Sequence, residues 1–371
     1  MLPWLLHPFR EAIPGLSVFR YVTFRTAMAA ATAMVLSLLL GPWLIRTLTA
    51  LKMGQHIRGE GPDHHQKKAG TPTMGGLLIL MVITVSTLLW CDLKSGPIWV
   101  VLLSLLGFGL VGAFDDAKKL LKKQNLGLTS WQKMLLLTVI SLGVAWFILH
   151  FGLRGANTSQ LSVPFFKKFH PNVGVFLIPW IWLVMVGTSN AVNLTDGLDG
   201  LATGGTLVVS LTFGILAYVA GHAKIATYLA VPFVPGGAEL SVFMGAMGGA
   251  CLGFLWYNAH PAEVFMGDTG SLALGGAQGA AQGQGALGTA AVIIKQELLL
   301  VIAGGLFVLE AFSVILQVGS FKLRGGKRIF RMAPFHHHME LSGLDETKVV
   351  IRLWITAIVC SILALSSLKL R

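Results

Sequence analysis

Long apolar runs alternate with short polar segments along most of this chain. A helix that crosses the hydrocarbon core of a bilayer, about 30 Å thick, needs about 20 mostly apolar residues. The runs that meet or approach this length are Thr26–Leu44, Thr73–Leu89, Pro97–Phe114, Met134–Leu149, Val173–Val192, Leu201–Ala220, Leu240–Tyr257, Leu272–Ile294, Leu298–Val318 and Val349–Leu368. The pattern predicts an all-α polytopic membrane protein with about ten transmembrane helices.

Two of these runs differ from an ordinary lipid-facing helix. Leu272–Ile294 is rich in glycine and contains glutamines at positions 278, 282 and 284. Small residues let helices pack closely, so we expect this run inside the bundle or at a subunit contact, where it is compatible with a homodimer. Leu298–Val318 contains Glu310 and Gln317, whose spacing of seven residues places them on one helix face.

The stretch before the first long run has a different character. Residues 1–21 hold a short apolar stretch interrupted by charged residues, together with Trp4, Phe9 and Phe19, and no convincing signal-peptide cleavage site. This composition favours an interfacial segment. Since no repeat or linker divides the remainder, we expect a single integral membrane domain over residues 1–371.

Composition narrows the class of protein further. The chain is 54% hydrophobic and 12% charged, whereas a soluble domain has about 25% charged residues. The net charge is still +12, from 28 Lys and Arg against 16 Asp and Glu. So few charges exclude a disordered chain. They also exclude a nucleic-acid binder, whose cations form a dense patch.

The charged residues are distributed unevenly between the two sets of loops. The loops after the first, third and ninth runs contain Arg46, Lys52, Arg58, Lys67, Lys68, Lys118, Lys119, Lys122, Lys123, Lys133, Lys322, Arg324, Lys327, Arg328 and Arg331. The opposite loops contain only Lys94, Arg154, Lys167, Lys168, Lys224 and Lys295. The positive-inside rule makes the first set cytoplasmic and both termini external, that is periplasmic. Most of the histidines and the acids Asp115, Asp116, Asp196, Asp199, Glu263 and Asp268 occur on the basic side, which indicates a site for phosphates and a metal.

Two acidic segments are the first candidates for that site. Asp115 and Asp116 end the third run, and adjacent carboxylates there can hold Mg²⁺ or accept a proton. The lysines that follow suit a phosphate or an anionic lipid head group; a charged helix end in water is the alternative. Asn193, Asp196 and Asp199 are spaced three apart, so a helical turn aligns them. An ordinary polar turn is the alternative there.

A third acidic segment lies before the eighth run. Asp268 stands between Gly267 and Thr269, in a stretch that also contains Asn258. Mg²⁺ typically takes one or two carboxylates together with phosphate oxygens and water, and a helix start adds N–H groups that face an anion. The alternative is an Asp that only caps the next helix.

Two further segments have a cationic character. His336, His337 and His338 are consecutive and lie among Arg and Lys, so phosphate binding or proton transfer is favoured. Zn²⁺ is disfavoured, because neighbouring side chains seldom converge on one tetrahedral ion. Before the second run, Lys68 offers donors to an anion together with Thr71 or Thr73, and Lys133 precedes the fourth run; each is weak evidence alone.

These five segments, in this order, closely resemble the phospho-N-acetylmuramoyl-pentapeptide-transferase family, the bacterial enzymes also called translocase I. The resemblance extends from about Phe19 to Arg371 and rests on Lys68–Gly76, Asp115–Asp116, Asn193–Leu201, Phe265–Asp268 and Ala333–His338. The acidic segments are shared by the wider superfamily of polyprenyl-phosphate N-acetylhexosamine-1-phosphate transferases. The triple histidine and the Lys68–Gly76 segment indicate the muramoyl-pentapeptide branch.

The resemblance implies a ten-span enzyme of the bacterial inner membrane whose active site faces the cytoplasm. It implies transfer of phospho-MurNAc-pentapeptide from UDP-MurNAc-pentapeptide to undecaprenyl phosphate, which gives lipid I and UMP and requires Mg²⁺. By position, Asp268 is the metal ligand, with Asn193 as a second candidate, and Asp115 and Asp116 act at the lipid phosphate, one as base. The implied substrate-binding residues are Lys68, Thr73, Lys133, Asn193, Asp196, Asp199, Asn258, Gly267, Gln317, His337 and His338, with His336 also a catalytic candidate.

Two alternative functions remain at this stage. One is a polyprenyl-phosphate GlcNAc-1-phosphate transferase of the same superfamily. The other is a secondary transporter that uses the intramembrane Glu310 as its coupling site. Transporters place polar groups near mid-membrane and often have repeated halves, so the one-sided carboxylates disfavour the transporter. Direct attack by the lipid phosphate and a covalent aspartyl-phosphate route both remain open.

Overall fold

The computed structural model describes residues 1–6, 8, 14–51, 70–121, 127–155, 158–166, 169–274 and 286–370. Within these ranges every regular element is a helix, apart from isolated bridge residues at Pro72 and at the pair Gln160 and Asn172. The helices are α1 (Leu2–Leu5), η2 (Pro14–Arg20), α2 (Val22–Ala50), α3 (Gly76–Trp90), α4 (Gly96–Leu121), α5 (Ser130–His150), η4 (Gly174–Phe176), α6 (Leu177–Thr195), α7 (Leu201–Gly221), α8 (Ala223–Leu229), α9 (Glu239–Asn258), α10 (Gly267–Leu274), α11 (Ala286–Ile293), α12 (Glu297–Ala303), α13 (Gly305–Leu323), α14 (Phe335–Glu340) and α15 (Glu346–Leu370). The all-α class is confirmed.

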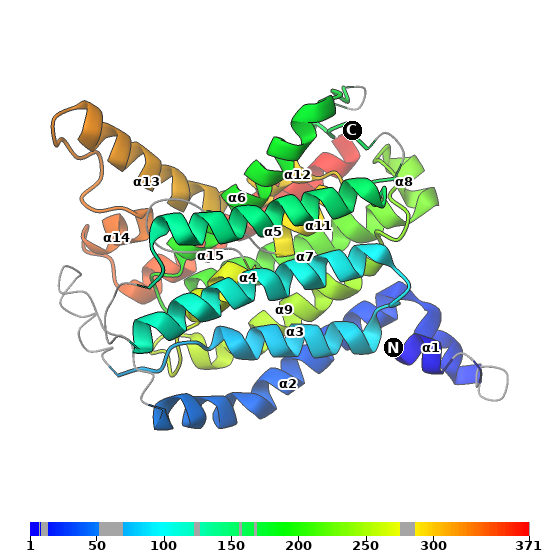
Figure 1. The fold of residues 1–371 in the computed structure, drawn as a ribbon, viewed down its shortest axis with the longest axis horizontal. Coiled ribbons are helices and arrows are strands. Elements are labelled where there is room, and N and C mark those ends of the chain that lie inside the picture. The colour runs from blue at the N-terminus through cyan, green and yellow to red at the C-terminus, as the bar shows by residue number, and fades with distance from the viewer. Residues whose placement is uncertain are drawn as a thin grey trace.

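The membrane-spanning character is confirmed as well. Among the described residues, seven helices are long and apolar enough to cross a membrane, namely α2, α4, α5, α7, α9, α13 and α15, and shorter apolar helices lie at α3 and at the start of α6. The N- and C-termini lie at the same end of the bundle (Figure 1). An even number of membrane crossings, as expected from the ten runs, places both termini on the same side.

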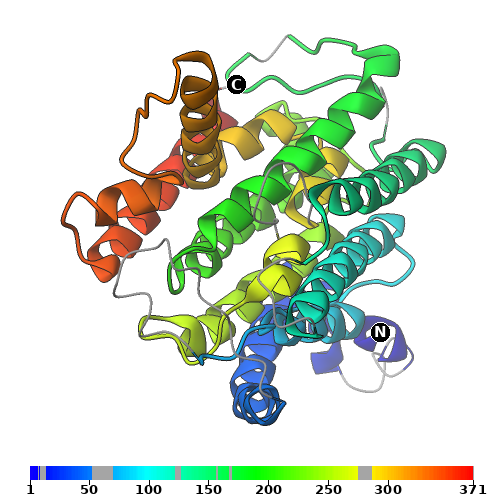
Figure 2. The ribbon, with the colours of Figure 1, turned by 60° about the vertical axis from the view of Figure 1, so that its left-hand side comes forward.

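The eighth and ninth runs differ from the other spans. The eighth contains the end of α10 and all of α11, and its centre, with the three glutamines, lies outside the described residues. Leu272, Ala273 and Leu274 and the whole of α11 are buried, and α10 and α11 (yellow) lie among the other helices in Figure 2. The expected position inside the bundle is therefore confirmed for these parts. The ninth run is divided at Gly304 into α12 and α13.

Small residues allow α9 to pack at the centre of the bundle. Most of α9 is buried between α2 and α7. A Cβ atom on Gly249 would collide with the carbonyl of Ala30 in α2, so the two backbones touch. Close approach of this kind is typical of membrane helix pairs, whose association depends on packing contacts and not on the hydrophobic effect.

The same device places α10 against α3 and α4. A Cβ atom on Gly112 of α4 would collide with the carbonyl of Asp268, and one on Gly76 of α3 would collide with the backbone of Gly270. These glycines bring the start of α10 directly to the end of α4. The acidic ends of both helices therefore meet.

At the opposite end of the bundle, one part-buried and one fully buried ion pair join distant segments. Arg25 at the start of α2 contacts Glu239 at the start of α9, with 2.5 Å between Nη2 and Oε1. Arg154 pairs with Glu297 while both side chains are fully buried, and it also donates to the carbonyls of Thr158 and Gln160. A buried pair is tolerated when further hydrogen bonds satisfy it. These pairs fix the fold far from the candidate site.

The N-terminal segment is helical over α1 and η2 and contacts the start of α2 and helix α3. Phe19 stacks on Trp90 with 5.7 Å between ring centroids. Its expected place at the membrane interface, and the single domain over the whole chain, stay predictions.

Candidate active site

Three carboxylates meet where α4 ends and α10 begins. Asp115, Asp116 and Asp268 are all buried, and each offers an oxygen within 4.8 Å of the others. Three carboxylates at this distance repel one another unless cations neutralise them. An all-oxygen donor set is the kind that hard divalent cations prefer.

Two lysines supply positive charge to this centre. Lys119 Nζ lies 2.7 Å from Asp115 Oδ2 and 2.7 Å from Asp268 Oδ2. Lys133 Nζ lies 2.9 Å from Asp268 Oδ2 and 3.5 Å from Asp115 Oδ2. Burial opposes ionisation of Asp268, but Lys133, a hydrogen bond with Asp115 and Lys119 outweigh it and hold the pKa of Asp268 well below its ordinary value. Asp268 is therefore an anion that can hold a cation.

Lys119 was not singled out from its basic neighbours by sequence. Its spacing of three and four residues from Asp116 and Asp115 on one helix was the available signal. The same spacing applies to many solvated lysines, so it did not distinguish Lys119 from Lys118. The fold distinguishes the two lysines, because α10 brings the third carboxylate, Asp268, to Lys119.

Asp115 and Asp116 differ in what they bind. Asp116 accepts hydrogen bonds from the backbone N–H groups of Asp268 (3.2 Å) and Thr269 (2.8 Å) and from the Thr269 hydroxyl (2.7 Å). It therefore caps the N-terminus of α10 from another helix, a favourable place for an anion. Asp115 accepts one backbone N–H, from Leu128 at 2.6 Å, and its other oxygen faces the lysines.

Asn193 adds an amide to the centre from the end of α6. Its Nδ2 donates to Asp268 Oδ1 at 3.2 Å and to the hydroxyl of Ser271. Its Oδ1 is buried and has no hydrogen-bond partner among the described residues. A buried acceptor without a donor is costly, and an oxygen in this position suits a bound cation. The residues present therefore fit a divalent metal.

The turn before α10 depends on Gly267. Its φ is +70°, a region that other L-residues adopt at a cost. A Cβ atom there would lie 2.8 Å from both Asp116 Oδ2 and Thr73 Oγ1. Thr73 and Gly267 thus adjoin the carboxylate centre.

Asp196 follows α6 and is only partly buried. Loss of water around it, and then the negative charges of Asp268, Asp116 and Asp199, raise the pKa of Asp196 well above its ordinary value. The negative field of the centre therefore reaches this loop and favours the neutral form of Asp196.

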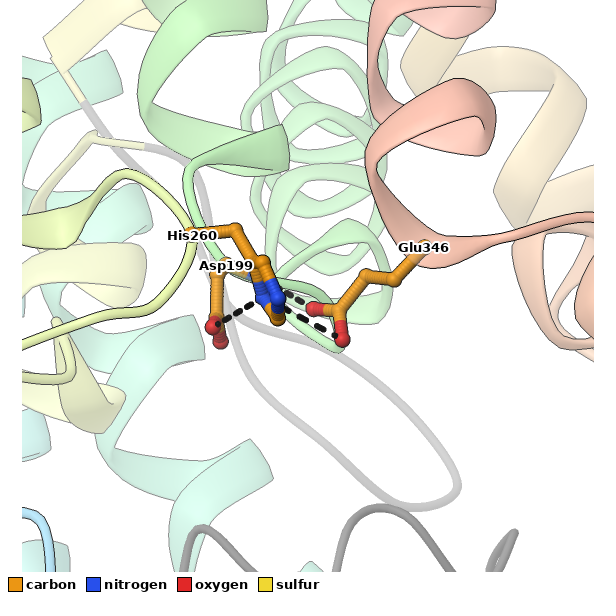
Figure 3. Close-up of side chains that lie close together, drawn as sticks. All are labelled: Asp199, His260 and Glu346. Carbon is orange, nitrogen blue, oxygen red and sulfur yellow. Dashed lines mark hydrogen bonds and ion pairs between the residues drawn. The ribbon is translucent and has the colours of Figure 1, made fainter.

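Asp199 belongs to a second cluster, shown in Figure 3. Asp199 Oδ2 lies 3.0 Å from His260 Nδ1 and accepts the N–H of Ala262 at 3.2 Å. Glu346, at the start of α15, accepts the N–H of Asp199 at 3.1 Å and lies 3.6 Å from His260 Nδ1. The three side chains come from three separate elements, so this cluster ties the 196–200 loop to the chain after α9 and to the C-terminal helix. His260 and Glu346 were not predicted as site residues.

Two residues expected to contact the substrate, Asn258 and Gln317, already form hydrogen bonds within the protein. Asn258 accepts from the hydroxyl of Thr203 (2.8 Å) and donates to the carbonyl of Val264 (3.0 Å). Gln317 accepts from the N–H groups of Ile329 (3.0 Å) and Phe330 (2.9 Å) and donates to the carbonyl of Phe330 (2.9 Å). Gln317 thus holds the loop after α13, which extends beyond the neighbouring helices (Figure 1).

The three histidines have separate partners. His336 is buried against Glu310, His337 Nδ1 lies 2.8 Å from Glu340 Oε2, and His338 Nδ1 accepts the N–H of Arg331. They do not converge on one point. Lys68 lies outside the described residues.

Comparison with known proteins decides the family. The model of glycosyl transferase family 4 matches residues 98–283, and signature 1 of the phospho-N-acetylmuramoyl-pentapeptide-transferases matches residues 68–80. The phospho-N-acetylmuramoyl-pentapeptide-transferase of Citrifermentans bemidjiense is 53% identical over 371 residues, which cover all of both chains. That of Desulfotalea psychrophila is 54% identical over 368 residues, 99% of each chain. The chain belongs to the phospho-N-acetylmuramoyl-pentapeptide-transferase family.

Membership in the phospho-N-acetylmuramoyl-pentapeptide-transferase family confirms the resemblance based on five short segments. It makes the protein a transferase, as its full-length relatives are named, and the seven apolar helices of the described residues agree with a multi-pass membrane protein. The transporter alternative is therefore wrong. The signature match begins at Lys68.

Proposed function

We propose that this protein transfers phospho-MurNAc-pentapeptide from UDP-MurNAc-pentapeptide to undecaprenyl phosphate, giving lipid I and UMP. The observation that supports it most is the meeting of Asp115, Asp116 and Asp268 with two lysine ammonium groups at a helix end. Phosphoryl transfer depends largely on positioning and on charge stabilisation. This centre would supply both, at one end of the apolar helix α4.

The metal in this proposal is Mg²⁺, which Asp268 and the carbonyl oxygen of Asn193 would hold. When bound, Mg²⁺ would neutralise negative charge on the diphosphate. Lys119 and Lys133 would contribute further positive charge to the same oxygens.

Asp115 is the better candidate for the proton acceptor. The Asp116 oxygens accept three hydrogen bonds at the start of α10, so Asp116 acts mainly by holding Asp268 in place. Asp115 has one oxygen that faces the lysines and accepts no backbone N–H. In the direct route, an oxygen of the lipid phosphate bonds to the β-phosphorus, the bond from that phosphorus to the bridging oxygen breaks, and UMP leaves. Asp115 takes the proton of the lipid phosphate when it is protonated.

The remaining substrate contacts are proposed around this centre. They are Lys68, Thr73, Asp196, Asp199, Asn258, Gly267, Gln317, His336, His337 and His338. Asp199, Asn258 and Gln317 would act chiefly through the backbone that they hold, since their side chains already bond to the main chain at Ala262, Val264 and Phe330.

The site would face the cytoplasm of a bacterium, in the inner membrane, with both termini periplasmic. The support is the positive-inside rule applied to the loops that surround the carboxylate centre. A homodimer stays a prediction from the glycine-rich eighth run.

The test is UMP release by purified protein in detergent, with undecaprenyl phosphate and Mg²⁺. We expect release with UDP-MurNAc-pentapeptide and none above background with UDP-GlcNAc. The opposite preference would assign the protein to the GlcNAc-1-phosphate branch. Formation of a phosphosugar–enzyme adduct without lipid phosphate would refute the direct route.

A further inference from the structure

Glu310 and His336 form a buried pair apart from the carboxylate centre. Both side chains have 0% exposure, although Glu310 lies within the membrane-spanning α13. Glu310 Oε2 lies 3.1 Å from His336 Nδ1 and accepts the backbone N–H of His336 at 3.3 Å. Ionisable residues inside a membrane are costly and usually functional. Because His336 is the hydrogen-bond partner of Glu310, a functional role of Glu310 would act through His336.

The pair determines which ring nitrogen of His336 has the proton. An ionised carboxylate only accepts hydrogen bonds. With Glu310 in that form, Nδ1 is the donor to Glu310 Oε2. In a neutral imidazole this leaves Nε2 without a hydrogen and able to accept one. A carboxylate behind a histidine fixes the tautomer and the ring orientation in many active sites.

The Nε2 atom of His336 is directed at the acidic loop after α6. A Cβ atom on Gly197 would collide with Nε2 and Cε1 of His336, so the ring touches the loop between Asp196 and Asp199. Nε2 is buried and has no hydrogen-bond partner in the described part of the chain; the same holds for Glu310 Oε1. Buried polar atoms are nearly always paired, and a bound substrate can supply the missing donor.

We propose that Glu310 is a positioning residue that holds His336 with Nδ1–H toward α13, so that Nε2 accepts a hydrogen bond from an O–H or N–H group of the nucleotide-sugar substrate at Gly197. This inference rests on the proposed function for the identity of the substrate. It also gives Gly197 a reason to be glycine, since a larger residue would displace the ring.

The test is a double-mutant cycle on Glu310→Gln and His336→Ala, with kcat/KM measured from UMP release. A glutamine amide can donate to Nδ1 and so permits the opposite tautomer. We expect each single variant to lose roughly 10- to 100-fold in kcat/KM, as for other carboxylates that orient histidines. The double variant should lose no more than His336→Ala alone.

The matched control is Glu239→Gln, which alters a part-buried carboxylate paired with Arg25 at the opposite end of the bundle. The fold-loss in kcat/KM from Glu239→Gln should multiply with the loss from His336→Ala, because the two sites do not touch. Multiplicative losses for Glu310→Gln and His336→Ala would overturn the proposal, since Glu310 would then act independently of His336.

A second variant covers the case in which Glu310→Gln does not fold. Gly197→Ala adds one methyl group against Nε2; it should lower kcat/KM in the wild-type background and have no effect beside His336→Ala. An equal loss in both backgrounds would contradict the proposed contact. If UDP-GlcNAc proves to be the donor, the proposed function fails, and the same cycle measured with that donor still decides the role of Glu310.

Discussion

Gly267→Ala tests whether the turn before α10 sets the position of Asp268. Alanine at φ +70° costs roughly 1–2 kcal/mol relative to glycine. Its Cβ would also lie 2.8 Å from Asp116 Oδ2 and from Thr73 Oγ1, so both groups must move by a few tenths of an ångström. Asp116 Oδ2 is the atom that accepts the N–H and hydroxyl of Thr269. Any such movement therefore displaces the start of α10.

The expected loss in kcat/KM is roughly tenfold, because a misplacement of about 1 Å at a reacting centre can cost about 100-fold and this one is smaller. The assay is UMP release, with thermal unfolding of the same detergent-solubilised sample. Gly174→Ala is the matched control, since Gly174 has φ +52° and no atom lies within 4 Å of the place that its new methyl group would take. It has the same kind of backbone strain far from the site.

Both alanine variants should unfold at a lower temperature, and only Gly267→Ala should lose activity. Wild-type kcat/KM in Gly267→Ala, together with the expected loss of stability, would refute the argument that this turn positions Asp268. An equal loss of activity in Gly174→Ala would show that general strain is the cause.

Three further outcomes are expected. Asp268→Asn should lower turnover by at least about 100-fold while the protein stays folded, because it removes the anion between two lysines; appreciable activity would contradict its proposed metal role. Chelation with EDTA should abolish UMP release, and added Mg²⁺ should restore it; activity that persists would contradict the metal requirement. Glu346→Ala should raise KM for the nucleotide donor more than it lowers kcat, since alanine has no acceptor for the N–H of Asp199 and Glu346 holds the loop there; a pure kcat effect would contradict this assignment.

The apolar runs predicted the helices well, because a span must satisfy its backbone hydrogen bonds internally and its length is fixed by the bilayer. The ninth run is the place where this reasoning failed, since it is broken at Gly304 into α12 and α13. Hydropathy records how apolar a segment is and does not record where packing against neighbours bends it.

The candidate site was predictable in outline from the residue types at span ends. Asp115, Asp116 and Asp268 come together with Lys133 and Asn193 as the chemistry of a phosphate site requires. The roles of the two adjacent aspartates were not predictable, since neighbours in sequence have the same composition around them. Only the packing of α10 on α4 makes Asp116 a helix cap and leaves Asp115 facing the lysines.

The sequence by itself determined the membrane class, the approximate spans and the family. It also determined that acidic and basic residues gather at one end of the bundle. These properties depend on local composition and on short motifs. The tertiary structure decided which side chains are partners. Asp116 reaches Thr269 across 153 residues, Glu346 reaches Asp199 across 147, and Glu310 reaches His336 across 26. Such contacts depend on how helices far apart in sequence pack together, and no local period along the chain records that.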